Sequence, residues 1–288
     1  MAAMWIDTHC HPFAASLRQE EGAAFERARA AGVSKFIVVG YDLEANRDVL
    51  RIIGEEPDAW GAVGIHPCEA NLFSEEVLAL IETQAAHPKI VAIGEMGLDY
   101  YHKETTREEQ EIAFRRQIAL AKELDLPCIV HSRDAAEDTL SILLEEKATK
   151  VVFHCFSYGP DFARKVWEAG YFTSFSGVVS YPNAKEIQEA ARIAPAHLIL
   201  TETDCPWLAP QSIRGQRNEM AYVREVGEKL AELRTISKAE MQALILENSL
   251  NLFRFNNYGR LSTLHRTGIN HCFGGERLPF LDRLELEW

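Results

Sequence analysis

The chain has 288 residues, of which 47% are hydrophobic and 25% are charged, and its formal net charge is −13 at pH 7. This acidity excludes a protein that binds nucleic acid through a broad basic face, so a polyanionic substrate must be held locally by metal ions and a few cations. No apolar run approaches the roughly 20 residues that cross a bilayer, which predicts no membrane partner. The six cysteines lack C-x-x-C spacing, which predicts reduced thiols and a cytoplasmic protein.

Short apolar runs alternate with amphipathic stretches along most of the chain. The runs are rich in β-branched residues and almost continuously apolar, as in strands buried on both faces. The predicted strands are Trp5–His11, Lys35–Tyr41, Trp60–His66, Ile90–Asp99, Pro127–Arg133, Lys150–Phe156, Tyr171–Gly177 and Leu198–Asp204. Helical patterns between them include Thr106–Leu124, Asp134–Lys147, Asp161–Ala169 and Asn183–Ala194. In the first of these, the residues predicted to face the sheet are Ile112, Phe114, Ile118, Ala119 and Ala121.

Eight β–α units in succession predict an α/β fold with a closed parallel sheet, a (β/α)8 barrel of the TIM type. An open doubly wound sheet is the alternative, but the chain lacks the G-x-G-x-x-G turn that such sheets carry after their first strand. The barrel is predicted to be a single domain over residues 1–255. Residues 256–288 follow no barrel pattern and are predicted to be a C-terminal extension of unknown role.

Ionisable side chains gather at the carboxyl ends of the predicted strands. They are His9 and His11 on the first strand, His66 on the third, Glu95 on the fourth, His131 on the fifth, His154 on the sixth and Asp204 on the eighth. In a parallel barrel these ends meet at one face, where barrel enzymes keep their active sites. His9 and His11 are two residues apart on a strand, so their side chains project to the same face while Cys10 projects to the other.

Burying so many ionisable groups in one barrel mouth without a cation would be costly, which predicts a metal site. The predicted ligands are His9, His11, Glu95, His131, His154 and Asp204. One catalytic zinc ion needs about three protein ligands, so this larger set favours two divalent cations with Glu95 as a bridge. A bridging hydroxide between them would be the nucleophile, and Asp204 would also act as a general base.

At these residues the chain resembles the TatD family of metal-dependent deoxyribonucleases, from Ile6 to about Phe253. The segments that carry the resemblance are Ile-Asp-Thr-His-Cys-His (6–11), Gly-Ile-His-Pro (64–67), Ile-Gly-Glu-Met-Gly-Leu-Asp-Tyr (93–100), Pro-Cys-Ile-Val-His-Ser-Arg (127–133), His-Cys-Phe-Ser (154–157), Ser-Phe-Ser-Gly (174–177) and Thr-Glu-Thr-Asp-Cys-Pro-Trp-Leu-Ala-Pro (201–210). Two positions depart from the family pattern. Cys68 stands where the family often has a second histidine, and Met220 stands where proline is usual.

The resemblance implies a hydrolase of DNA phosphodiesters, working as a 3′→5′ exonuclease that prefers single strands. It implies that one metal ion lies among His9, His11, Glu95 and Asp204, and the other among Glu95, His131 and His154. His66 would lie near the scissile phosphate as a catalytic and substrate-binding residue. Arg133 would contact a phosphate, or else form a salt bridge with a neighbouring acid. Glu202 would either orient a metal-bound histidine or pair with an arginine.

Imidazole-rich ligation favours Zn²⁺ or another transition metal in the purified protein, whereas the family's nuclease activity implies Mg²⁺ or Mn²⁺ in the reaction. The expected partner is DNA, taken at single-stranded ends. Its bases would stack on exposed aromatic rings, unless these pack within the protein: Tyr100, Tyr101, Phe156, Tyr181 and Trp207. An amidohydrolase or esterase acting on a small molecule or an aminoacyl-tRNA is the alternative. A barrel that binds without catalysis is a third interpretation, which predicts no bound metal.

Overall fold

The computed structural model describes residues 4–253 and 255, which contain a sheet of eight parallel strands. The strands are β1 (Trp5–Cys10), β2 (Val33–Val39), β3 (Ala59–Val63), β4 (Ile90–Asp99), β5 (Cys128–Arg133), β6 (Val151–Phe153), β7 (Phe172–Phe175) and β8 (Ile199–Thr201). Each strand pairs in parallel with the next one along the chain. The predicted (β/α)8 barrel is confirmed, and the extension predicted at residues 256–288 lies outside the described residues.

Backbone hydrogen bonds between β1 and the segment after β8 close the barrel. The amide of Asp204 donates to the carbonyl oxygen of His9 over 2.9 Å. The amide of His11 in turn donates to the carbonyl oxygen of Cys205, also over 2.9 Å. Because these bonds lie at the carboxyl ends of the two strands, the closure of the barrel also holds Asp204 beside His9 and His11.

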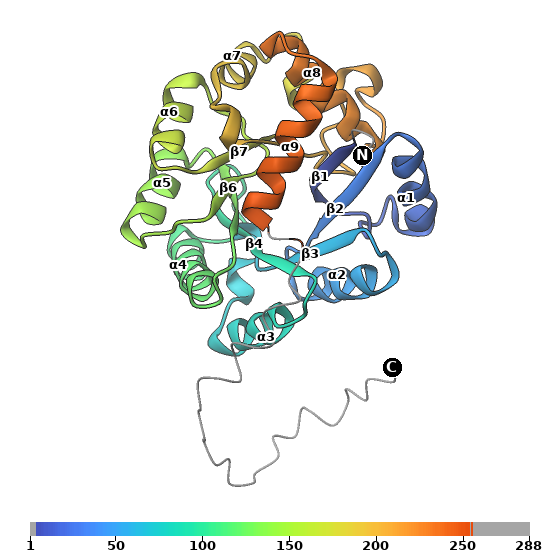
Figure 1. Ribbon diagram of the computed structural model, residues 1–288. Coiled ribbons are helices and arrows are strands. Elements are labelled where there is room, and N and C mark those ends of the chain that lie inside the picture. Colours follow the sequence, from blue (N-terminus) through green and yellow to red (C-terminus); the bar gives the residue numbers. More distant parts are fainter. Residues whose placement is uncertain (1–3, 254, 256–288) are drawn as a thin grey trace, which may run out of the picture. The chain divides into compact units, whose positions relative to one another are not determined.

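Helices alternate with the strands and surround the barrel, except the last helix of the described chain, which lies across one end of it (Figure 1). They are α1 (Glu21–Ala30), α2 (Leu43–Glu55), α3 (Glu75–Ala85), α4 (Arg107–Glu123), α5 (Ala136–Glu145), α6 (Pro160–Glu168), α7 (Lys185–Ile193), α8 (Val223–Arg234) and α9 (Lys238–Phe253). The four predicted helices correspond to α4, α5, α6 and α7. The helix α4 begins at its predicted start, where Thr106 and Glu109 form a capping box. Among the described residues, every helix is too short or too polar to cross a membrane.

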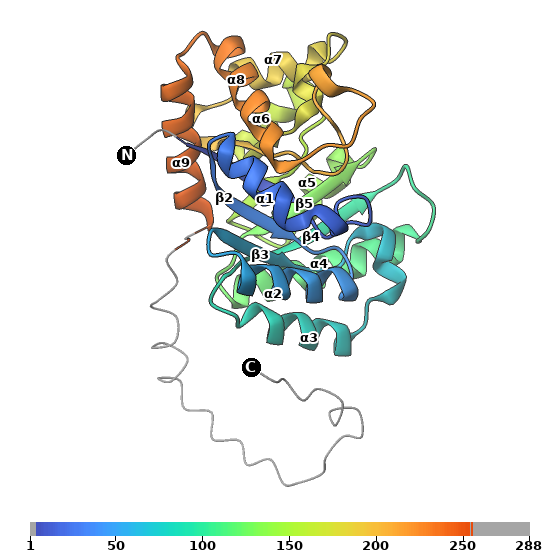
Figure 2. The ribbon, with the colours of Figure 1, turned by 90° about the vertical axis from the view of Figure 1, so that its right-hand side faces the viewer.

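Apolar side chains fill the inside of the barrel. The cluster is drawn from six of the eight strands and comprises Ile37, Val39, Ala62, Val91, Ala92, Ile129, Val152 and Leu200, with Leu252, Phe253 and Phe255 from the end of the described chain. Trp60 in β3 donates its indole N–H to the carbonyl oxygen of Phe255 over 3.2 Å. Figure 2 shows α9 at the end of the barrel where the strands begin. The carboxyl ends of the strands are therefore the end left available for a site.

The face of α4 that contacts the strands is partly polar, and the prediction that Ile112 faces the sheet is wrong. That residue is 52% exposed rather than buried against the sheet. Gln117 is buried, and its amide accepts a hydrogen bond from the backbone N–H of Ile65 (2.8 Å) and donates one to its carbonyl oxygen (3.1 Å). Gln110 binds the backbone of Asp99 in the same way, at 2.9 Å for both bonds. The polar face of α4 thus fixes the chain at the ends of β3 and β4.

Gly97 in β4 lies too close to β5 for any larger residue. Its φ is +145°, and a Cβ there would stand 1.9 Å from the carbonyl oxygen of His131. Gly97→Ala is therefore expected to lower the free energy of unfolding by about 2 kcal/mol or more, as measured by urea denaturation. Gly22→Ala in α1 is the control: a Cβ there meets nothing within 4 Å, so stability should rise by up to about 1 kcal/mol. Equal stability of the two variants would contradict the argument.

Candidate metal centre

The side chains predicted as metal ligands meet at the carboxyl end of the barrel. Three of them lie within strands β1, β4 and β5: His9, Glu95 and His131. The other three follow the ends of β1, β6 and β8: His11, His154 and Asp204. Strands β6 and β8 end earlier than predicted because the chain turns out of the sheet at Cys155 and Asp204, where φ is +41° and +54°.

One group of donor atoms forms around His9 and His11. Their Nε2 atoms lie 3.0 Å apart, as expected for residues two positions apart in extended chain, whose side chains project to the same side. Oε2 of Glu95 lies 3.3 Å from Nε2 of His9 and 3.9 Å from Nε2 of His11. Oδ1 of Asp204 lies 3.7 Å and 3.3 Å from the same two atoms. Imidazole and carboxylate groups converging in this way can hold a divalent transition metal.

The other carboxylate oxygen of Glu95 faces a second group of donors. Oε1 lies 2.7 Å from Nε2 of His154 and 3.1 Å from Nδ1 of His131. These two ring nitrogens are 3.3 Å from each other. Glu95 is therefore shared, with one oxygen atom directed at each group of imidazoles. Single carboxylates that link two metal ions have this arrangement.

Both carboxylates of the centre are ionised despite their burial. Burial of Glu95 would raise the pKa of its carboxyl, but the surrounding imidazoles, led by His154, hold that pKa well below its usual value. Burial likewise opposes ionisation of Asp204, and the neighbouring imidazole of His11 leads the groups that keep its pKa low. Ionised carboxylates are the form that binds metal ions, so the electrostatics suit the donor chemistry.

Hydrogen bonds behind the donor groups orient three of the rings. Nδ1 of His11 lies 2.7 Å from the carbonyl oxygen of Val39. Nε2 of His131 lies 3.0 Å from Oδ2 of Asp99, and Nδ1 of His154 lies 3.3 Å from Oε1 of Glu202. Partners of this kind fix the direction of an imidazole ligand and raise its basicity. Asp99 was not among the predicted site residues, although its position four residues after Glu95 places it on the same face of β4.

Glu202 is fully buried and contacts His154, whereas the predicted alternative, a pair with an arginine, is absent from the described residues. Its Oε1 also accepts the backbone N–H of Cys155 over 2.6 Å. Glu202→Gln preserves the shape but removes the negative charge beside the imidazole. We expect the second donor group to bind metal about 10- to 100-fold more weakly, as measured by isothermal titration calorimetry. An unchanged metal affinity would show that Glu202 only packs in the core and does not support the ring of His154.

His66 lies at the edge of the second donor group, after the end of β3. Its Nε2 is 3.5 Å from Oε1 of Glu95, and its Nδ1 accepts a hydrogen bond from the backbone N–H of Cys68 over 3.1 Å. Burial and the charge of His131 lower the pKa of His66 to about 3. The ring is therefore neutral at physiological pH, and its single proton is on Nε2, because Nδ1 is an acceptor. This imidazole can donate a hydrogen bond to an anionic oxygen in the centre.

Arg133 ends β5 at the exposed rim of the barrel, with its guanidinium carbon 3.8 Å from the centre of the Tyr101 ring. Within the described residues Arg133 forms no ion pair, so the structure does not contain the alternative, a salt bridge with a neighbouring acid. Tyr101 is 57% exposed. Trp207 is 49% exposed and contacts the ring of His11 at 5.3 Å between centroids. The other aromatic residues considered for base stacking are less exposed: Phe156, Tyr100 and Tyr181.

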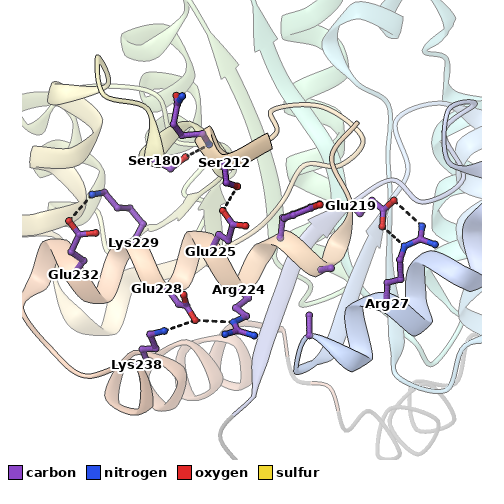
Figure 3. Close-up of a pocket in the computed structure, with 14 residues that line it drawn as sticks. Arg27, Ser180, Ser212, Glu219, Arg224, Glu225, Glu228, Lys229, Glu232 and Lys238 are labelled. Atoms are coloured by element: carbon purple, nitrogen blue, oxygen red, sulfur yellow. Dashed lines mark hydrogen bonds and ion pairs between the residues drawn. The ribbon is translucent and has the colours of Figure 1, made fainter. Parts of the chain in front are cut away.

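A separate cavity of about 800 Å³ lies on the outside of the barrel, along α8 and the end of α1. Its charged side chains point toward one another (Figure 3). The pairs are Arg27 with Glu219, Arg224 and Lys238 with Glu228, and Lys229 with Glu232. Because these charges are satisfied within the protein, the cavity offers an anionic substrate little, and we place the chemistry at the barrel mouth.

Comparisons with known proteins show which family the sequence and the fold resemble. A family model described as TatD related DNase matches residues 6–254. An uncharacterized metal-dependent hydrolase of Bacillus subtilis, YabD, is 42% identical over 88% of this chain and 100% of its own length. The 3′-5′ ssDNA/RNA exonuclease TatD of Erwinia tasmaniensis is 33% identical, over 82% of this chain and 94% of that protein. The crystal structure of YJJV, a TatD homologue from Escherichia coli, superposes with a TM-score of 0.84 at 30% identity, covering 88% of this chain and 99% of YJJV.

Proposed function

The chain belongs to the TatD family of metal-dependent hydrolases, and from this premise we propose that it cleaves DNA phosphodiesters as a 3′→5′ exonuclease acting on single strands. The observation that carries the proposal is the carboxylate of Glu95, which is shared between two groups of imidazoles. The Erwinia relative is named as a 3′-5′ exonuclease of single-stranded DNA and RNA, which supports the substrate class.

We assign the two donor groups to a pair of divalent cations. One would be held by His9, His11, Glu95 and Asp204, and the other by Glu95, His131 and His154. Two cations bound there would supply positive charge to a phosphodiester and lower the pKa of a water molecule beside it. The imidazoles favour Zn²⁺ or another transition metal in the purified protein, while Mg²⁺ or Mn²⁺ is proposed for the reaction.

The remaining steps fall to side chains of the protein. Asp204 is an ionised carboxylate at the centre and would accept a proton from the attacking water. His66 would donate its Nε2 proton in a hydrogen bond to a phosphate oxygen. At the rim, the exposed rings of Tyr101 and Trp207 would stack bases of the strand.

Because the net charge is −13, extended contact with duplex phosphates is unfavourable, which supports binding at a strand end. The described cysteines are free thiols, which supports the proposed cytoplasmic location.

Digestion of a 5′-labelled single-stranded oligonucleotide tests the proposal. With Mg²⁺ or Mn²⁺, products should shorten stepwise from the 3′ end, and a chelator should stop the reaction. A matched duplex with no overhang should be cut more slowly. Intact DNA together with turnover of an ester or amide panel would instead identify an amidohydrolase or esterase.

Arg133→Ala is expected to raise KM for the oligonucleotide about tenfold, with kcat changed less than about twofold, because the guanidinium would bind a phosphate without taking part in the chemistry. Arg107→Ala is a matched control, since this arginine also lies on a tyrosine ring, 3.9 Å from the centre of Tyr100, but on α4. Steady-state kinetics on one oligonucleotide should separate the two variants. Equal KM values would remove Arg133 from the substrate site.

A further inference from the structure

A second cluster of metal-binding side chains lies beside the centre, and of its three members only Asp99 contacts a predicted ligand of the centre, His131. Cys68 lies in the short helix Pro67–Leu72 after β3, Asp99 is the last residue of β4, and His102 is in the loop that follows. One ligand atom from each of the three lies within 4.8 Å of the other two. The short helix after β3, the end of β4 and the loop after it therefore bring a thiol, a carboxylate and an imidazole close together.

The hydrogen bonds of Asp99 leave one feature of this cluster unexplained. Its Oδ1 accepts the backbone N–H groups of Tyr101 and His102, at 2.9 Å and 2.8 Å, which accounts for the turn. Its Oδ2 lies 2.9 Å from Nδ1 of His102 and 3.0 Å from Nε2 of His131. None of these contacts needs a sulfur atom, yet Cys68 directs its ligand atom into the same space.

The surroundings of the thiol favour a cation. Burial is the main reason that the pKa of Cys68 rises to about 12, and the negative charges of Asp99, Glu104 and Glu69 add to it. A positive ion placed among these carboxylates would be stabilised by the same field, and on binding it the thiol would release its proton to solvent and become a thiolate. Access from solvent exists, because the side chain of His102 is 40% exposed.

We propose that Cys68, Asp99 and His102 bind an additional divalent cation of the Zn²⁺ type. Thiolate, imidazole and carboxylate are the ligands that zinc prefers, and three protein ligands would leave one position open. Oδ2 of Asp99 contacts both His102 and His131, so the added ion would be connected through one carboxylate to a ligand of the proposed pair. The site does not depend on the substrate and would stand if the nuclease proposal failed.

Titration of the full chain with Co²⁺ tests the site. The two donor groups around Glu95 contain no sulfur, so a thiolate-to-cobalt charge-transfer band in the near ultraviolet reports only binding at a cysteine. We expect a band that saturates with one thiolate-bound cobalt per chain and is lost in Cys68→Ala. Cys155→Ala is the control, because that thiol also lies at the barrel mouth, where it shares a hydrogen bond with the hydroxyl of Ser176, and the band should remain.

His102→Ala supplies an independent variant in which the thiol is intact. It should retain the band but require at least about tenfold more Co²⁺ to reach half saturation, because one of three ligands is lost. Circular dichroism would show that each variant is folded. Absence of the band in the parent protein, or a band that survives in Cys68→Ala, would overturn the proposal whatever the result with oligonucleotides.

Discussion

Glu95→Gln should reduce the hydrolytic rate by at least about a thousandfold and lower the Mn²⁺ content from two ions per chain toward none. The side chain is 6% exposed and directs one oxygen at each donor group. An amide of the same size keeps one acceptor oxygen, loses the negative charge, and turns an N–H₂ group toward the other imidazoles. Both groups are therefore expected to weaken together, because they share this one residue.

Elemental analysis after equilibrium dialysis, combined with the oligonucleotide assay, would measure both effects in the same preparation. Glu137→Gln is a suitable control, because that glutamate is exposed on α5 and pairs only with Lys165 among the described residues. It should retain the parent metal content and rate. Loss of one ion alone in Glu95→Gln, with the second bound at parent affinity, would show that Glu95 is not shared between two sites.

Asp204→Asn should lower kcat by about 100- to 10,000-fold and leave KM within about threefold, because it removes the proposed general base without touching the rim. The donor group of His131 and His154 does not include Asp204, so the ion proposed there should remain. Single-turnover kinetics at saturating metal would separate loss of the base from loss of an ion. A parent-like rate in Asp204→Asn would transfer the role of base to another residue.

The barrel could be predicted because strands buried on both faces are continuous apolar runs, and the range predicted for β4, Ile90–Asp99, coincides with the observed strand. The convergence of the ionisable side chains followed from the parallel topology alone, since the carboxyl ends of such strands share one face. Their division into two groups was only implied by resemblance. That division depends on which oxygen of Glu95 faces which ring, and side-chain rotamers are not encoded in a pattern of residue types.

Other features were missed for physical reasons that can be named. The ends of β6 and β8 were placed too late, because the chain leaves the sheet in turns where Cys155 and Asp204 have positive φ, a backbone conformation that the pattern of residue types does not reveal. The inner face of α4 was predicted as apolar, but buried Gln110 and Gln117 are used there to bind the backbone at the barrel mouth. Glutamine in a helix gives no signal of that kind, since it is usually found at the surface.

Anomalous diffraction from crystals of the Mn²⁺-loaded protein would test the central claim most directly, because it locates each ion without reference to activity. We expect two peaks, one on either side of the Glu95 carboxylate, with His9 and His11 around the first and His131 and His154 around the second. A single peak, or ions bound away from the carboxyl end of the barrel, would contradict the assignment of these residues to a paired metal centre.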